Sequence, residues 1–281
     1  MKPYLYMISY GLSQTVVWIL VSYLSNNVSI AVMFLFRNFV GFAISMVRKP
    51  VYKISRTTLK RWKMHLVRAS AALFGGLSIF YSVTKIPVAD SVAITFLAPI
   101  FGSLLSIYFL KEKLTSRLMV KLIGGLIGVY VITGFSADGE WIGYVAAIVG
   151  ALMTGLAYVS VKSLADTETP QDILSVSYLI MIPISGIFAA TDWVTPNVDQ
   201  LGWLIGIGVA FYMSQFFMTK AFSLAPASKI LPVDYTRILF SSFLGYVFLN
   251  QDITLLTFIG SLIILLTSLI QEPKLKKRIA N

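Results

Sequence analysis

The residues best suited to chemistry are an acid and a base three positions apart in an otherwise apolar segment. Asp234 and Arg237 are separated by Tyr235 and Thr236, and Pro232 precedes them. Side chains three apart share a helix face, so the carboxylate and guanidinium could form an ion pair or contact one ligand together. Arg237 could hold a carboxylate or phosphate through its planar fork, and Asp234 could bind an amine or take up a proton. A purely structural ion pair is the alternative.

Several reaction classes lack the side chains that they require. The chain has no cysteine, which excludes disulfides, thiolate metal sites and thiol nucleophiles. His65 is its single histidine, so a multi-histidine metal site or a histidine relay is not expected. No nucleotide-binding motif is present. We therefore predict no catalytic residues, no metal and no cofactor, and hence no enzyme.

The composition is typical of a protein that faces lipid. Hydrophobic residues make up 57% of the chain and charged residues only 12%, whereas about 25% of a soluble domain is charged. A net charge of +11 would point to nucleic acid in a soluble protein. Here the basic residues fall on one side of the predicted membrane segments, so we expect the bilayer as a partner and no nucleic acid.

Ten segments are apolar and long enough to cross the roughly 30 Å of bilayer hydrocarbon as helices. They span 3–24, 29–47, 65–84, 88–110, 116–134, 141–163, 172–191, 201–222, 228–249 and 253–270. The loops between them leave no room for a soluble domain. We predict an all-α integral membrane protein with ten transmembrane helices.

Lysine and arginine are divided unequally between alternate loops, which indicates the orientation. With residue 1 inside, the inner connections hold nearly all the loop Lys and Arg, including the clusters in 48–63 and 274–278. The outer loops contain Lys85 as their only basic residue. We expect a bacterial inner-membrane protein with both termini in the cytoplasm.

Further charges occur within the apolar segments. Arg68 and Lys121 lie one to two turns from the predicted inner ends of their helices, and we expect both to snorkel to the interface. Arg37 lies deeper and has no acid nearby in its own helix. It could pair with Asp234, bind backbone carbonyls or contact a ligand.

The two halves of the chain are related by an internal repeat. Residues 100–112 align without a gap on residues 239–251, and Pro87 meets Pro226 at the same offset. The identical pairs are Phe101 with Phe240, Ser103 with Ser242, Leu105 with Leu244, Phe109 with Phe248 and Leu110 with Leu249. Five helices per half is an odd number, so the second half enters the membrane from the opposite side. We predict two inverted repeats, 1–136 and 137–281, an arrangement common in secondary transporters.

Short motifs also follow one another in a recognisable order. They are Phe36-Arg37-Asn38, the run 86–101 (IPVADSVAITFLAPIF), Lys111-Glu112-Lys113-Leu114, Leu224-Ala-Pro-Ala-Ser228 and Pro232-Val-Asp-Tyr-Thr-Arg237. In this order and with the inverted topology, nearly the whole chain resembles the EamA-type proteins of the drug/metabolite transporter superfamily. It departs from them in ending segment 228–249 with Asn250-Gln251 instead of an acid, and in combining Asp234 with Arg237.

The resemblance implies a secondary transporter of small polar metabolites such as amino acids, amine derivatives or S-adenosylmethionine-like compounds, working as a monomer or homodimer. It also implies a central cavity between segments 3–24, 65–84, 88–110, 141–163, 201–222 and 228–249. The candidate substrate-contacting residues are Asp234, Arg237, Tyr235, Trp18, Tyr158, Tyr81, Tyr212, Gln215 and Arg37. Aromatic rings suit a cationic amine or a flat ring, although helix packing would explain each of them equally well. Asp234 is the candidate for proton coupling.

Other functions are open from the sequence alone. An uncoupled facilitator would need the same cavity. A lipid or polyprenyl-phosphate flippase could hold a phosphate with Arg37 and Arg237. A membrane enzyme would need clustered acids or histidines near an interface, where the loops offer only Asp166, Glu168 and Asp172. Import and export both occur among proteins of the family that the chain resembles.

Overall fold

The computed structural model describes residues 1–24, 27–48, 54–83, 85–86, 91, 94–113, 115–133, 140–249, 255–268 and 270. These residues are mostly helical, and no strand occurs among them. The elements are α1 (Lys2–Leu24), α2 (Ile30–Arg48), α3 (Arg56–Lys60), α4 (Trp62–Val83), α6 (Ala98–Leu110), α7 (Ser116–Thr133), α8 (Trp141–Ala165), α9 (Pro170–Thr191), α10 (Val198–Leu224), α11 (Ala227–Ile230), the 3₁₀-helix η2 (Leu231–Thr236), α12 (Arg237–Leu249) and α13 (Leu255–Ser268).

The predicted all-α membrane fold is confirmed. Each predicted segment contains helix in the structure, although much of the first part of segment 88–110 lies outside the described residues. By length and apolar composition, α1, α2, α8, α9 and α10 are able to cross a membrane, and α6 and most of α13 are shorter apolar helices. Large apolar side chains such as Phe39, Ile187 and Leu266 are exposed on the outer surface, as lipid contact requires.

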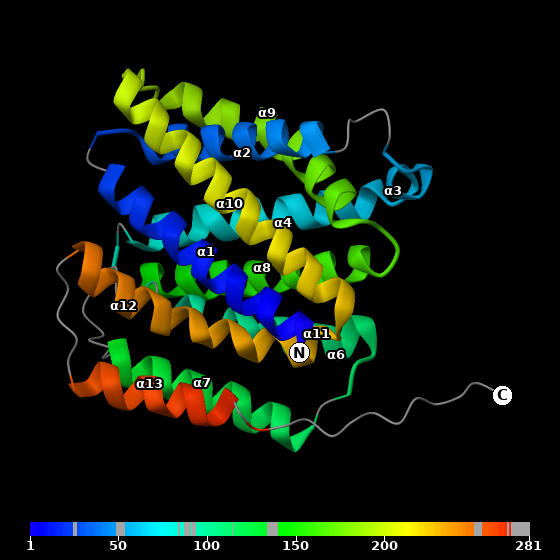
Figure 1. The fold of residues 1–281 in the computed structure, drawn as a ribbon, viewed down its shortest axis with the longest axis vertical. Helices are drawn as coiled ribbons and strands as arrows, with labels where there is room; N and C mark the ends of the chain where they lie inside the picture. Colours follow the sequence, from blue (N-terminus) through cyan, green and yellow to red (C-terminus); the bar gives the residue numbers. More distant parts are fainter. Residues whose placement is uncertain are drawn as a thin grey trace.

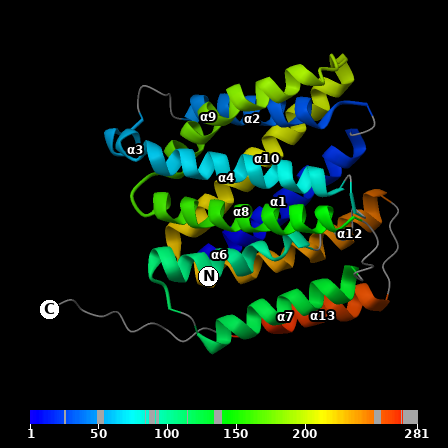
Figure 2. The ribbon, with the colours of Figure 1, turned by 180° about the vertical axis from the view of Figure 1, so that it is seen from behind.

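The pairs of helices that pack together correspond between the two halves of the chain. α4 packs along α8, and α1 packs along α10. α2 packs against α9, and α7 packs against α13 at one end of the row of helices (Figures 1 and 2). In a five-helix repeat α1 corresponds to α8 and α4 corresponds to α10, so the α4–α8 pair is equivalent to the α10–α1 pair. The α2–α9 and α7–α13 pairs each join two corresponding helices. The packing therefore has the pattern that two inverted repeats produce.

The segment that carries Asp234 is not one continuous α-helix. It begins as the single turn α11, tightens into η2 and continues as α12. Segment 228–249, which the sequence predicts to cross the membrane, is therefore helical with a 3₁₀ stretch at residues 231–236. Pro232 has no backbone N–H to donate, and it stands in the first turn of η2. In the other half, α6 begins at Ala98, which the gap-free alignment places opposite Arg237, the first residue of α12.

Polar contacts join the halves at the end of the bundle where α1 begins (Figure 1). Both carboxylate oxygens of Glu112 accept hydrogen bonds of 2.8 Å from backbone N–H groups at the start of α11, those of Ala227 and Ser228. The single histidine, His65, is buried and lies 2.9 Å from Glu168. These contacts fix the ends of α6 and α8 against segments distant in the sequence.

Candidate functional site

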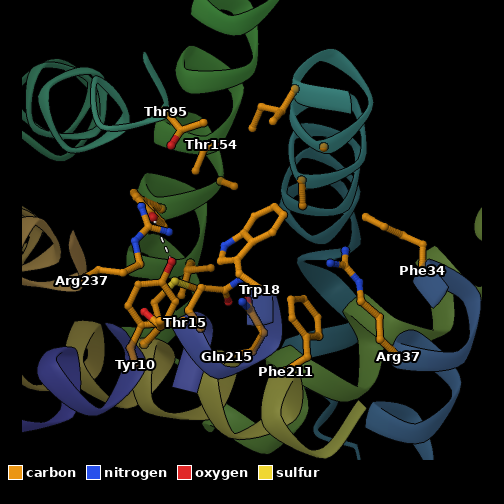
Figure 3. Close-up of a pocket in the computed structure, with 18 of the residues that line it drawn as sticks. Tyr10, Thr15, Trp18, Phe34, Arg37, Thr95, Thr154, Phe211, Gln215 and Arg237 are labelled. Carbon is orange, nitrogen blue, oxygen red and sulfur yellow. Dashed lines mark hydrogen bonds between the residues drawn. The ribbon is translucent and has the colours of Figure 1, made fainter. Parts of the chain in front are cut away.

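A cavity of about 430 Å³ lies among the helices, a volume within the range of small-molecule sites. Residues of α1, α2, α4, α8, α9, α10 and α12 form its walls, together with Thr95 and Phe96 before α6 (Figure 3). All six segments that the resemblance implied contribute, and α2 and α9 complete the wall.

An ion pair and two phenols form a chain along one wall. Arg237 Nη2 lies 3.4 Å from Asp234 Oδ2, and the Tyr158 hydroxyl donates to the same oxygen over 3.2 Å. The Tyr10 hydroxyl lies 3.0 Å from that of Tyr158. Arg237 and both tyrosines line the cavity, whereas Asp234 is fully buried behind them. The carboxylate is therefore connected to the cavity through Tyr158 and Arg237.

The tight winding of η2 explains why the acid and the base meet. Side chains three apart eclipse in a 3₁₀-helix, whereas they are offset in an α-helix. Asp234 lies in η2, and Arg237 is the first residue of α12. The guanidinium also lies 4.9 Å from the centre of the Phe96 ring, on the opposite repeat.

Tyr235 is directed away from this pair. It is 1% exposed, and its ring stacks on that of Phe96 with centroids 6.2 Å apart. A Cβ atom at Gly125 of α7 would lie 2.2 Å from the Tyr235 ring, so the phenol fits where that helix has no side chain. Tyr235 does not line the cavity.

The middle of the cavity is formed by amide and indole groups. Trp18 and Gln215 both line it, and Figure 3 shows them between Arg237 on one side and Arg37 on the other. Gln14, one turn before Trp18, accepts a hydrogen bond of 3.0 Å from the Ser214 hydroxyl. α1 and α10 are thereby held together next to the cavity.

Arg37 lies on the opposite side of the cavity from Arg237 (Figure 3). Its guanidinium carbon is 3.3 Å from the centre of the Phe34 ring and 4.1 Å from that of Phe211. The pairing of Arg37 with Asp234, one of the alternatives raised from the sequence, does not occur, because Asp234 pairs with Arg237.

Arg68 is a cavity residue that the sequence analysis missed. It was expected to snorkel, but it is 5% exposed, lines the cavity and donates a hydrogen bond to the Ser177 hydroxyl of α9. Residues 72, 76 and 79 of α4 line the same wall. This helical spacing, with small residues at 72 and 76, was the signal that Arg68 points inward.

Two of the candidate tyrosines lie elsewhere. Tyr212 is 1% exposed and stacks on Phe216 with centroids 6.3 Å apart, away from the cavity. Tyr81, near the end of α4, is 48% exposed and is not part of the cavity wall. Of the residues chosen from the sequence, Trp18, Arg37, Tyr158, Gln215 and Arg237 line the cavity.

Among the described residues, no group of three acidic or histidine side chains is arranged to hold a metal ion. The cavity instead presents guanidinium, phenol, amide and indole groups, which can bind and orient a polar solute.

Comparisons with known proteins identify the family and the fold of the chain. The model of the EamA-like transporter family matches residues 1–134 and again residues 141–270. A crystal structure with 17% sequence identity superposes with a TM-score of 0.74 and covers 92% of this chain and 93% of its own, which shows the shared fold.

Curated relatives are similar over most of the chain. An uncharacterized transporter of Helicobacter pylori is 31% identical over 80% of this chain and 82% of its own. An S-adenosylmethionine uptake transporter of Rickettsia conorii is 26% identical over 81% of this chain and 79% of its own. The chain belongs to the EamA-like transporter family, within the drug/metabolite transporters of the membrane.

Proposed function

We propose that the protein is a secondary transporter that moves small polar metabolites, chiefly amino acids and their amine-bearing derivatives, across the inner membrane by alternating access. The central cavity with its buried ion pair carries this proposal. A charge at the bilayer centre costs about 2.5–3.5 kcal/mol on insertion scales, so charges kept there usually serve a function or are paired. A polar cavity at that depth is where a transporter binds its substrate.

The cavity combines residues from both proposed repeats, 1–136 and 137–281. Tyr10, Arg37 and Arg68 come from the first, and Tyr158 and Arg237 from the second. A substrate bound between them would contact both halves. Exchanging the conformations of two inverted halves would then open the same site to the other side.

The proposed orientation places both termini in the cytoplasm. The cavity reaches Ser22 and Gly245, which lie toward the predicted outer ends of α1 and α12. The lining also includes Val161 and Leu174, toward the predicted inner ends of α8 and α9, so the cavity follows much of the length of the predicted membrane segments.

Asp234 and Arg237 would bind the amino-acid part of the substrate. Arg237 would hold the carboxylate, while Asp234 would bind the amine or carry a proton through its contact with Tyr158. The name of the Rickettsia relative, an S-adenosylmethionine uptake transporter, supports a substrate that has both groups.

The test is uptake into proteoliposomes, using labelled amino acids and S-adenosylmethionine with and without an imposed pH gradient. We expect uptake of a subset of these solutes, and its loss in a folded Asp234→Asn variant. Asp166→Asn, at an exposed acid outside the cavity, should transport normally. Uptake that grows with the gradient indicates proton coupling, and uptake that ignores it indicates a facilitator. Full activity of Asp234→Asn would remove its proposed role.

A further inference from the structure

We propose that Arg37, Arg68 and Tyr178 form a binding subsite for an oxyanion, so that the substrate carries a second acidic group beyond its amino-acid part. This inference rests on the proposed transport function and specifies the substrate class of the same cavity. The three residues come from α2, α4 and α9, and all of them line the cavity.

Arg37 has donors that the protein leaves unused. Its guanidinium lies against the rings of Phe34 and Phe211, and its buried Nε atom has no hydrogen-bond partner. Aromatic faces attract a cation and fix its plane. They do not accept the in-plane hydrogen bonds of the guanidinium, which a carboxylate or phosphate would accept.

Arg68, like Arg37, is held in place without an acidic partner. It donates to the Ser177 hydroxyl, and that hydroxyl in turn donates to the Ile173 carbonyl over 2.6 Å. The buried Nε atom of Arg68 has no partner. The hydrogen bond to Ser177 orients the guanidinium without neutralising it.

Tyr178 lies on the same cavity wall as the two arginines. Its neighbour Ser177 accepts the hydrogen bond from Arg68, and Phe211 contacts both Tyr178 and Arg37. The buried hydroxyl of Tyr178 has no hydrogen-bond partner. The ring is 2% exposed and packs edge-on against Phe211 with centroids 6.5 Å apart. Two guanidinium groups and a phenol therefore offer unused donors in one part of the wall.

This part of the wall lacks a compensating anion. Among the residues that the structure describes, no acid lies within ion-pair distance of Arg37 or Arg68, and Asp234 is paired with Arg237. Buried charges are normally paired, because their lost hydration has to be replaced. Two like charges beside one phenol are best explained by an anion that arrives with the substrate.

The position of the subsite defines the substrate class. Arg37 lies across Trp18 and Gln215 from Arg237 (Figure 3). A solute with an amino-acid group at one end and a carboxylate or phosphate at the other would fill both ends of the cavity. An amino acid with a neutral or cationic tail would leave the arginines uncompensated.

The experiment measures binding to the purified full-length protein by calorimetry. L-2-aminoadipate and L-2-amino-5-phosphonopentanoate serve as acidic-tailed probes, and L-norleucine serves as the neutral probe. We expect at least one acidic probe to bind about tenfold or more tightly than norleucine, since hydrogen bonds between charged groups are the strong ones. The carboxylate and phosphonate probes distinguish the two forms of the acidic group.

Variants then assign this preference to the subsite. Arg37→Gln, Arg68→Gln and Tyr178→Phe should lose the preference but still bind norleucine, and Arg68→Lys should recover part of it. Arg48→Gln removes an arginine at the end of α2 that does not line the cavity, and it should leave the preference unchanged. Without ligand, Arg37→Gln and Arg68→Gln should melt at the same or a higher temperature, because an uncompensated buried charge has been removed. A clearly lower melting temperature would indicate that these arginines stabilise the fold, and it would contradict their proposed role in binding an anion.

The outcomes separate this inference from the transport function. If neither acidic probe binds more tightly than norleucine, the subsite is contradicted, even if neutral or cationic amino acids are transported. If no polar solute is transported under any gradient, the proposed function itself fails.

Discussion

The position of Tyr178 depends on the absence of a side chain at Gly41. A Cβ atom added there would lie 2.6 Å from Cζ and 2.9 Å from Cε1 of the tyrosine ring. The ring is rigid and also packs against Phe211, so it could not move aside easily. Gly41 therefore sets where the phenol of the proposed oxyanion subsite lies.

Gly41→Ala should destabilise the protein by about 1–3 kcal/mol, the usual cost of overpacking a core. It should also weaken binding of the acidic probes more than that of norleucine. Thermal unfolding in detergent and calorimetry measure the two effects. The matched control is Gly202→Ala in α10, where an added Cβ meets nothing within 4 Å. Equal effects of the two substitutions would contradict the proposed packing.

Helix membership of the cavity residues was predictable from the sequence, but the rotation of each side chain was not. Asp234 and Tyr235 are adjacent, yet one joins the ion pair of the cavity wall and the other packs toward α7. The distance of Arg68 from the end of α4 predicts that it snorkels to the interface, whereas the helix face on which it lies directs it into the cavity. The position of a polar residue along its helix indicates its depth in the membrane, whereas the direction of its side chain depends on the helices that pack around it.

At the scale of elements, the 3₁₀-helix η2 determines how the ion pair of the site is positioned. Pro232 made a disturbance of this helix predictable, but not its form or length. The 3₁₀ turn eclipses Asp234 with Arg237, and the short helix α11 before it is capped by Glu112 from the other half. Gln251, the residue opposite Glu112 in the repeat, lies outside the described residues.

Glu112→Ala should lower the stability by roughly 0.5–2 kcal/mol, the range for losing a helix cap. Glu112→Gln should cost less, because its amide oxygen can still accept one of the two backbone hydrogen bonds. Thermal unfolding in detergent measures the loss. Glu140→Ala is the control, since Glu140 pairs with Lys85 on an exposed surface where ion pairs contribute little. A Glu112→Ala variant as stable as this control would show that the cap does not join the halves.

For the whole molecule, the distribution of charge supports one orientation. Lys85 is the only basic residue of the predicted outer loops, and it lies 3.0 Å from Glu140. The hydrogen bond to Glu140 and its negative charge raise the pKa of Lys85. The two charges cancel, so this contact adds no net positive charge to the predicted outer face.

The natural absence of cysteine makes this orientation directly testable. Thr195→Cys places one thiol in the exposed turn between α9 and α10, and Asp166→Cys places one beyond α8. A membrane-impermeant maleimide should label Thr195→Cys in intact spheroplasts, and Asp166→Cys only after permeabilisation. The reverse pattern would invert the proposed topology.

The positions of the helices were accessible from sequence because a long apolar segment is a strong signal in a membrane protein. The pairing of helices and the size of the cavity were not, because they arise from contacts between segments far apart in the chain. α1 with α10 and α4 with α8 are examples.

The central claim, that substrate passes through this cavity, is tested most directly by blocking it. Ser241 of α12 lines the cavity and is exposed, and in Ser241→Cys it becomes the only thiol of the chain. Substrate uptake by proteoliposomes is measured before and after labelling with a bulky maleimide. We predict normal uptake before labelling, near-complete loss after it, and slower labelling when substrate is present. Undiminished uptake by fully labelled protein would contradict transport through the cavity.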